Sequence, residues 1–440
     1  MTTTSQSGMS ERPTFREALE VWGKIGLLSF GGPAGQIALM HRVLVDERKW
    51  IGEQSYLAAL NFCMLLPGPE AMQLATYVGW RLHGTKGGLA AGLLFVLPGA
   101  FIMLALSLAY AQFGKLPLAE ALFVGIKAAV LAIVVEALVR VARRALKGSA
   151  DWAIAAAAFA AIFAFAVPFP AIVLAAALVG FLRSGSAARA ARPSAALPPV
   201  RLGETARTTL LWLAIWIVPL LLVALIFGSD HVLSDIAWFF SKLAVVTFGG
   251  AYAVLAYMAQ EAVEGYGWLA PGEMLDALGL AETTPGPLIL VAELVGTLAA
   301  WRHGGGTPVV MGILGALVTL WATFAPCFLW IFAGAPYIER LNAEPRLKSA
   351  LAAVTAAIVG VILNLTVWFA LHVLFGRVAD QDLGPLRLHV PDLASLNAEA
   401  LVLSAVAFAL LFAAKRGILA TLGLSGLLAL AWHQVAVFMS

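Results

Sequence analysis

Long uncharged stretches are the feature that most constrains how this chain can fold. Residues 89–111, 210–227 and 309–333 each approach or exceed the ~20 residues that a helix needs to cross the hydrocarbon core of a bilayer. Only 12% of the residues are charged and 61% are hydrophobic, whereas soluble domains carry roughly 25% charged residues. Such a chain cannot cover its surface with polar groups, so we expect a polytopic, all-α membrane protein.

The sequence also repeats itself at a spacing of 218 residues. Because several features share this one spacing without a gap, chance is a poor explanation, and we predict two homologous halves. The matching features are Lys24 and Lys242, Phe30-Gly31-Gly32 and Phe248-Gly249-Gly250, Trp50 and Trp268, and Pro67-Gly68-Pro69 and Pro285-Gly286-Pro287.

Beyond this block the match continues with a shift, since Pro98 corresponds to Pro326, which implies about ten extra residues near 303–306. Residues 184–207 are rich in Ala, Ser, Pro and Arg, which is typical of an exposed linker. The predicted organisation is a first transporter repeat (12–183), a basic cytoplasmic linker (184–207), a central connecting transmembrane helix (208–232) and a second transporter repeat (233–438).

Six membrane segments are predicted in each half, so that the connecting helix brings the total to about 13. The last two apolar segments of each half are short and either cross the membrane or form a re-entrant hairpin. One connecting helix turns the second half upside down relative to the first, so we predict inverted repeats. The distribution of Lys and Arg, for example Arg143, Arg144 and Lys147, predicts a cytoplasmic amino terminus.

Both copies of Pro-Gly-Pro interrupt an apolar stretch. Proline removes a backbone donor and clashes with the preceding turn, so each helix is expected to break there. In lipid the freed backbone groups need protein or water as partners, so a broken helix normally lines a cavity. The half-helix after the break presents unpaired N–H groups and a partial positive charge, which suits an anion. Matched breaks point to a transporter's binding site; the alternative is a pair of kinks that only shape packing.

Two other matched features accompany the breaks. Gly31-Gly32 and Gly249-Gly250 either supply backbone donors to an anion or allow two helices to touch. Lys24 and Lys242 lie six residues before Phe30 and Phe248, within apolar helices. Their ammonium groups either neutralise a dianion or snorkel to the membrane interface.

Polar residues next to the breaks complete the predicted substrate-binding set. Glu70 follows the first break and either caps the half-helix or carries a proton that couples transport. Gln73 and Tyr77 lie near the same helical face as Glu70, and Thr284 directly precedes the second break. Leu288 replaces Glu70 in the second half, so the two halves differ chemically at this point.

These motifs together resemble the chromate ion transporter family. The resemblance covers nearly the whole chain and is typical of the long, two-domain members. The second half departs from the pattern, since it has Leu288 and Val291 where the first half has an acid and a glutamine. The residues that carry it are Phe30-Gly31-Gly32-Pro33, Asp46-Glu47-Arg48-Lys49-Trp50, Leu66-Pro67-Gly68-Pro69-Glu70-Ala71-Met72-Gln73-Leu74-Ala75, Tyr77 and Gly79, then Thr247-Phe248-Gly249-Gly250, Trp268 and Thr284-Pro285-Gly286-Pro287.

The resemblance implies a bacterial inner-membrane protein that exports chromate from the cytoplasm and so confers chromate resistance. Chromate is a tetrahedral dianion similar to sulfate. We expect secondary active transport, because the sequence contains no Walker-type loop that would bind ATP. Protons are a candidate coupling ion, and a homodimer is a candidate assembly.

Other functions are weighed against this one. A sulfate or other oxyanion transporter and a passive anion channel stay open as alternatives. An enzyme is not predicted, because the seven histidines are scattered and form no catalytic cluster. We expect no cofactor, no metal site and no nucleic-acid partner.

Overall fold

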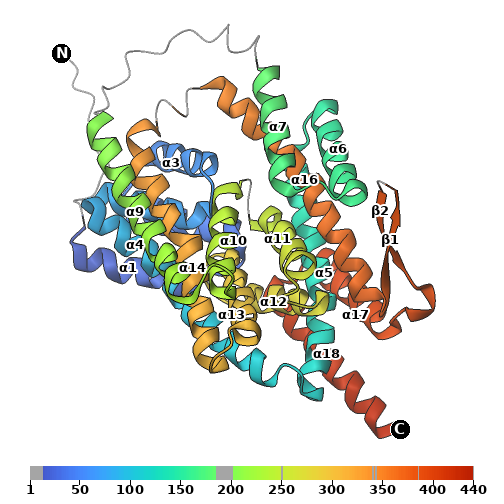
Figure 1. Ribbon diagram of the computed structural model, residues 1–440. Coiled ribbons are helices and arrows are strands. Elements are labelled where there is room, and N and C mark those ends of the chain that lie inside the picture. The colour runs from blue at the N-terminus through green and yellow to red at the C-terminus, as the bar shows by residue number, and fades with distance from the viewer. Residues whose placement is uncertain are drawn as a thin grey trace, which may run out of the picture.

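The computed structural model describes residues 13–184, 202–248, 251–338, 341, 344–384 and 386–439, and nearly all of them are helical (Figure 1). Gly249, Gly250 and most of the linker lie outside the described residues. One antiparallel pair of strands, β1 (Val378–Leu383) and β2 (Leu386–Pro391), follows the longest helix of the second half. The prediction of an all-α protein is therefore confirmed apart from this hairpin.

Six described helices are long and apolar enough to cross a membrane. Three shorter helices are also strongly apolar, so the chain is a multi-pass membrane protein. The last helix has 22 residues, so the prediction that the last segment of the second half is short is wrong. The long helices are α4 (Glu70–Phe113), α5 (Pro117–Ala145), α9 (Leu202–Phe227), α14 (Pro308–Gly334), α16 (Pro345–Leu374) and α18 (Ile418–Met439), and the shorter ones are α6 (Ser149–Phe165), α7 (Phe169–Arg183) and α17 (Ala398–Phe408).

Local sequence explains where several of these helices begin. Pro117, Pro308 and Pro345 occupy the first helical position of α5, α14 and α16, where the missing proline N–H has no helical partner to lose. Helix α6 begins where the Asp151 carboxylate accepts the Gly148 N–H at 3.0 Å. The chain is therefore divided into spans by residues that stop one helix and start another.

The same succession of elements occurs before each Pro-Gly-Pro. Each time a helix ends near the Phe-Gly-Gly motif, a short helix follows, a π-helical turn closes it, and another short helix runs up to the break. The first set is α1 (Phe15–Leu28), α2 (Gly32–His41), η1 (Arg42–Glu47) and α3 (Glu53–Leu65), and the second is α10 (Val232–Val246), α11 (Ala251–Gln260), η2 (Glu261–Gly265) and α12 (Pro271–Thr283).

The predicted breaks are present in both places. Helix α3 ends at Leu65 and α4 begins at Glu70, while α12 ends at Thr283 and is followed by a 3-10 turn and α13 (Val291–His303). Gly68 and Gly286 have φ angles of 115° and 94°, which a residue with a Cβ rarely adopts. Each tight bend therefore depends on glycine between the two prolines.

A helical hairpin follows each break: the two arms of α4 after the first, and α13 with α14 after the second. Helix α4 leaves helical geometry at His83 and Gly84, and its two arms touch where a Cβ at Gly87 would lie 2.2 Å from the Gly79 carbonyl oxygen. Likewise α13 packs along α14, and a Cβ at Gly315 would lie 2.3 Å from the carbonyl oxygen of Gly296. Glycine in both hairpins brings two backbones into direct contact.

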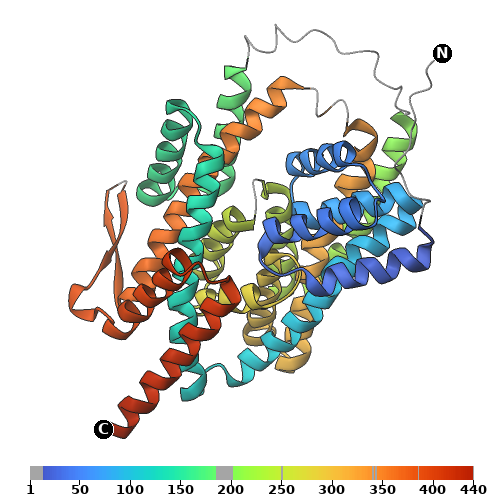
Figure 2. The same ribbon diagram turned by 180° about the vertical axis from the view of Figure 1, so that it is seen from behind.

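The described helices form two groups (Figures 1 and 2). The hairpin group contains α1–α4, α9, α10, α13 and α14, and the long-helix group contains α5–α7 and α16–α18. Helix α12 packs on both α13 and α5, and α11 packs on α16, so these two helices join the groups. Each group draws helices from the first and the second part of the chain, which are thus interleaved.

Substituting Gly87 tests the close packing of the α4 hairpin. Gly87→Ala should lower the thermal unfolding midpoint of the detergent-solubilised protein, because the added Cβ would lie 2.2 Å from a carbonyl oxygen. Overpacking of this kind typically costs about 1–3 kcal/mol. Gly23→Ala in α1 is the matched control, because its Cβ would meet nothing within 4 Å and alanine favours a helix. Equal midpoints for the two variants would contradict the packing described.

Candidate functional site

The two Pro-Gly-Pro breaks exchange backbone hydrogen bonds with opposite parts of the chain. The Gly68 N–H donates to the Thr247 carbonyl oxygen at 2.8 Å, and the Gly286 N–H donates to the Ser29 carbonyl oxygen at 2.8 Å. Ser29 and Thr247 directly precede the two Phe-Gly-Gly motifs. Each break thus receives an acceptor from the motif that belongs to the other half of the sequence.

A long hairpin helix from the other half of the sequence also packs against each break. A Cβ at Gly68 would lie 3.1 Å from the Cys327 Sγ of α14, and a Cβ at Gly99 of α4 would lie 2.0 Å from the Pro285 carbonyl oxygen. Gly99 and Cys327 follow Pro98 and Pro326, the two prolines matched in the sequence. The same kind of contact therefore occurs on both sides.

Two buried glutamines satisfy backbone carbonyls that the breaks set free. The Gln73 Nε2 donates to the Pro67 carbonyl oxygen at 2.6 Å, and the Gln36 Nε2 donates to the Gly286 carbonyl oxygen at 2.6 Å. Both glutamine side chains are fully buried, and their Oε1 atoms accept no hydrogen bond from the part of the chain that the structure describes. Gln36 was absent from the predicted site, although an isolated amide in an apolar segment is a signal that could have identified it.

A small cavity lies between the two breaks. Its volume is ≈ 10 Å³, which is near the lower limit for holding one water molecule. Residues from both breaks line it, so the breaks face one narrow space. The lining residues are Pro33, Gln36, Gly68, Pro69, Glu70, Ala71, Thr247, Pro287, Leu288 and Ile289.

Two helix beginnings point toward this small cavity. Pro69 precedes α4 and Pro287 precedes the 3-10 turn that leads into α13, and neither proline provides a side-chain cap. The first turn of a helix has N–H groups without intrahelical acceptors, and it carries a partial positive charge. The two helix beginnings therefore direct partial positive charge toward this space, which the Glu70 carboxyl group also lines.

A larger cavity of ≈ 500 Å³ adjoins the small one. Pro33, Gly68 and Glu70 line both cavities, so the larger one leads to the first break. It lies between α2 and α3 of the hairpin group and α5 and α16 of the long-helix group. Arg140 and Arg144, at the end of α5, contribute positive charge to it. Arg140 also donates from Nε to Glu136 at 3.1 Å, and Arg144 is exposed.

The two predicted lysines lie away from both cavities. Lys24 is exposed, because the buried stripe of α1 runs through Val21, Trp22 and Ile25 and leaves residue 24 on the opposite face. Lys242 is also exposed, and its Nζ lies 5.5 Å from the ring centre of Tyr257. The helical period of α1 was a signal that could have placed Lys24 on the outer face.

The other predicted residues are two buried side chains and the residues of the Phe-Gly-Gly motifs. Tyr77 is buried against the rings of Phe62 and Trp80, and Thr284 is buried with its hydroxyl donating to the Leu280 carbonyl oxygen at 2.8 Å. Phe30 and Phe248 are half-buried beside the acceptors Ser29 and Thr247. Gly31 has a φ angle of 86° and Gly32 starts α2, while Gly249 and Gly250 lie outside the described residues.

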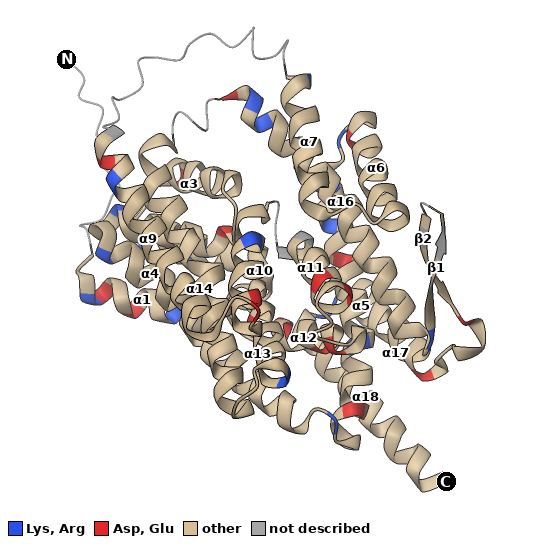
Figure 3. Ribbon diagram, in the orientation of Figure 1, with Lys and Arg blue, Asp and Glu red and all other residues tan. Residues whose placement is uncertain are grey.

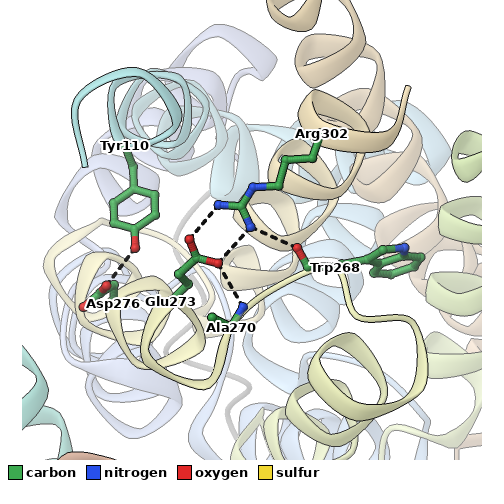
Figure 4. A network of polar contacts seen from close by, with 6 residues as sticks. All are labelled: Tyr110, Trp268, Ala270, Glu273, Asp276 and Arg302. Carbon is green, nitrogen blue, oxygen red and sulfur yellow. Dashed lines mark hydrogen bonds and ion pairs between the residues drawn. The ribbon is translucent and has the colours of Figure 1, made fainter. Parts of the chain in front are cut away.

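Arg302, in the last turn of α13, belongs to a network of polar contacts (Figure 4). The Arg302 guanidinium donates to both Glu273 carboxylate oxygens at 2.6 and 2.8 Å. The Tyr110 hydroxyl of α4 donates to Asp276 Oδ2 at 2.7 Å, and the Lys127 Nζ of α5 lies 3.5 Å from Asp276 Oδ1. These contacts connect α4, α5, α12 and α13, around which acidic residues gather in Figure 3.

The chain is similar to known proteins over most of its length. The model of the family described as "Chromate transporter" matches residues 16–181 and 234–430. A chromate transport protein of Pseudomonas aeruginosa is 34% identical over 77% of this chain and 77% of its own length. A chromate transport protein of Cupriavidus metallidurans is 30% identical over 84% of this chain and 86% of its own length.

A probable chromate transport protein of Synechococcus elongatus is 29% identical over 80% of this chain and 84% of its own length. No solved structure matches this chain. The family model covers most of the sequence and includes both Pro-Gly-Pro breaks. The chain therefore belongs to the chromate transporter family.

Proposed function

We propose that this protein is a secondary active transporter that exports chromate across the bacterial plasma membrane and so confers chromate resistance. The observation that carries the proposal is the meeting of two uncapped helix beginnings at one small cavity. Relatives named chromate transport protein support the choice of chromate.

Backbone N–H groups are the proposed ligands of the anion. A tetrahedral dianion presents oxygens in several directions, so donors from two opposed helix beginnings can hold it from both sides. The proposed contacts come from the segments Pro67–Glu70 and Pro285–Pro287 with their supporting residues Gln73 and Gln36. Lys24 and Lys242 are assigned no direct contact, since both are exposed. The cavity must widen before the anion fits, because a space of ≈ 10 Å³ holds at most one water molecule.

We infer that the two halves are inverted repeats related by a pseudo-twofold axis, with about 13 membrane segments. The reciprocal hydrogen bonds of Gly68 and Gly286 support this inference, as do the two separate matches to one family model. The halves differ in exposure: Leu57 and Met64 of α3 are 45% and 57% exposed, whereas Leu275 and Glu282 at the corresponding places in α12 are 0% and 6% exposed. This difference supports a state in which only the side of the first break is accessible.

The larger cavity is the proposed path from the cytoplasm. Arg140 and Arg144 line it, and basic residues favour the cytoplasmic ends of membrane helices. Positive charge in a low-dielectric cavity concentrates anions there. A membrane potential that is negative inside favours outward movement of a dianion by about 2.3 kcal/mol per charge per 100 mV. The amino terminus is assigned to the same side.

A gated carrier is preferred to a passive anion channel, because the space between the breaks is too narrow for an anion while a large cavity reaches only the first break. Sulfate is the second candidate substrate, since the proposed donors recognise a tetrahedral dianion rather than chromium chemistry. Protons are the proposed coupling ion.

Counterflow in proteoliposomes tests the proposed substrate. Vesicles loaded with chromate should accumulate labelled chromate against its gradient, because a carrier exchanges one bound anion for another. Molybdate and phosphate should compete more weakly than chromate. Faster counterflow of sulfate than of chromate would overturn the substrate, and flux that shows no counterflow would favour a channel.

Neutralising Arg144 tests the proposed path. Arg144→Ala should raise the KM for chromate about two- to tenfold at low ionic strength, with a smaller effect at high salt, because it removes positive charge from the cavity. Arg143→Ala is the matched control, since the neighbouring Arg143 is exposed and does not line the cavity. An equal rise in KM for both variants would show that only the net surface charge matters.

A further inference from the structure

A buried carboxylate in the second half has no hydrogen-bond partner among the described residues. Glu293 is the third residue of α13, just after the second break, and its side chain is 1% exposed. Neither carboxylate oxygen makes a hydrogen bond or ion pair with the described residues. The first half has Ala75 at the corresponding position, so the site occurs once in the repeat pattern.

The helices packed against α13 offer no charge to balance Glu293. They are α4, α10, α12 and α14. Thr319 of α14 lies against Gly296 of α13, and Thr323 follows one turn later. Both threonines are buried, and neither hydroxyl has a hydrogen-bond partner among the described residues. None of the described titratable side chains on these helices or on α13 itself pairs with Glu293. These side chains are Glu70, Tyr77, Arg81, His83, Lys86, Tyr110, Asp235, Lys242, Glu273, Asp276, Glu282, Arg302, His303 and Cys327.

Burial and isolation together determine the charge of Glu293. An ionised carboxylate without a partner is strongly unfavourable in an apolar interior, so the group holds a proton in this conformation. An intramembrane acid of this kind is typical of proton-coupled transporters. Solvent contact during the transport cycle would let the same group release that proton.

The position of Glu293 connects it to the anion. Ile289 lines the small cavity, and Glu293 follows four residues later, which is about 6 Å along a helix. Like charges repel strongly in a low-dielectric interior, so a dianion in the cavity would disfavour the ionised form of Glu293. Occupation of the cavity by an anion therefore favours the protonated form of Glu293, and release of the anion favours loss of the proton.

We propose that Glu293 is the proton-binding site that couples proton movement to anion transport. Each dianion is accompanied by one proton, so one net negative charge leaves the cytoplasm in a cycle. A membrane potential that is negative inside drives this charge outward, whereas an inward proton gradient opposes the step. This inference rests on the proposed transport function and assigns its coupling to a residue.

Glu70 differs from Glu293 in its surroundings. It is half-buried, lines both the small and the larger cavity, and is the first residue of α4. Glu70 is therefore placed on the path of the anion, because it lines both cavities, and the coupling proton is assigned to Glu293.

The experiment uses the full chain in proteoliposomes loaded with chromate at about pH 8.5, where chromate itself is a dianion. A trapped dye reports the lumenal pH while the voltage is clamped with potassium and valinomycin. Chromate efflux through the wild type should make the lumen more alkaline. Glu293→Gln should keep chromate efflux and lose the pH change, because Gln is isosteric with a protonated Glu and cannot release a proton. Glu120→Gln, at an exposed acid of α5, is the matched control and should behave as the wild type.

Three outcomes would overturn the inference. They are an unchanged alkalinisation in Glu293→Gln, chromate efflux through the wild type without any pH change, and a pH change that is lost in Glu70→Gln but kept in Glu293→Gln. A wild type that moves no chromate would contradict the proposed function instead.

A measurement on the wild type covers the case in which Glu293→Gln is not monodisperse. A hydrophobic carbodiimide reacts with protonated carboxyl groups, so mass spectrometry should find its adduct on Glu293. The yield should fall as the pH is raised. An adduct on Glu70 with none on Glu293 would also overturn the assignment.

Discussion

Backbone polarity in an apolar solvent is the constraint on which this structure depends. Every N–H and C=O group that a break removes from a helix must find another partner, because lipid provides none. Gly68 and Gly286 find theirs in the carbonyl oxygens of Thr247 and Ser29. Gln36 and Gln73 then supply donors to the carbonyl oxygens of Gly286 and Pro67. Backbone groups and two amide side chains thus provide these hydrogen bonds of the irregular backbone.

The arrangement of helices in two groups follows from these contacts. The hairpins of α4 and of α13 with α14 pack against the breaks, and glycine brings the two arms of each hairpin into backbone contact. The long-helix group forms the opposite wall of the larger cavity and contributes Arg140 and Arg144. Relative movement of the two groups would change the size of that cavity while the reciprocal hydrogen bonds inside the hairpin group stay intact. The fold therefore places the two breaks in one helix group and the opposite wall of the larger cavity in the other.

Local backbone structure could be predicted from the sequence, whereas hydrogen bonds between distant residues could not. Two prolines around Gly68 suffice to predict a break, because the loss of a donor and the steric clash are local effects. The acceptor of the Gly68 N–H lies at Thr247, which no periodicity indicates. The lysines illustrate a different limit: matched position suggested a shared role for Lys24 and Lys242, but the helical face on which they lie is exposed. The length of α18 was misjudged because Lys415 and Arg416 interrupt the apolar pattern before it starts.

The reciprocal hydrogen bonds also have a consequence for biogenesis. During synthesis from the amino terminus, the Gly68 N–H enters the membrane well before Thr247 has been made, and the Ser29 carbonyl waits still longer for Gly286. A nascent first half must therefore shelter open backbone groups in the translocation machinery or in water until the second half arrives. Completion of the fold is in this sense a late event, and a truncated chain would present the cell's quality control with an unfinished interior.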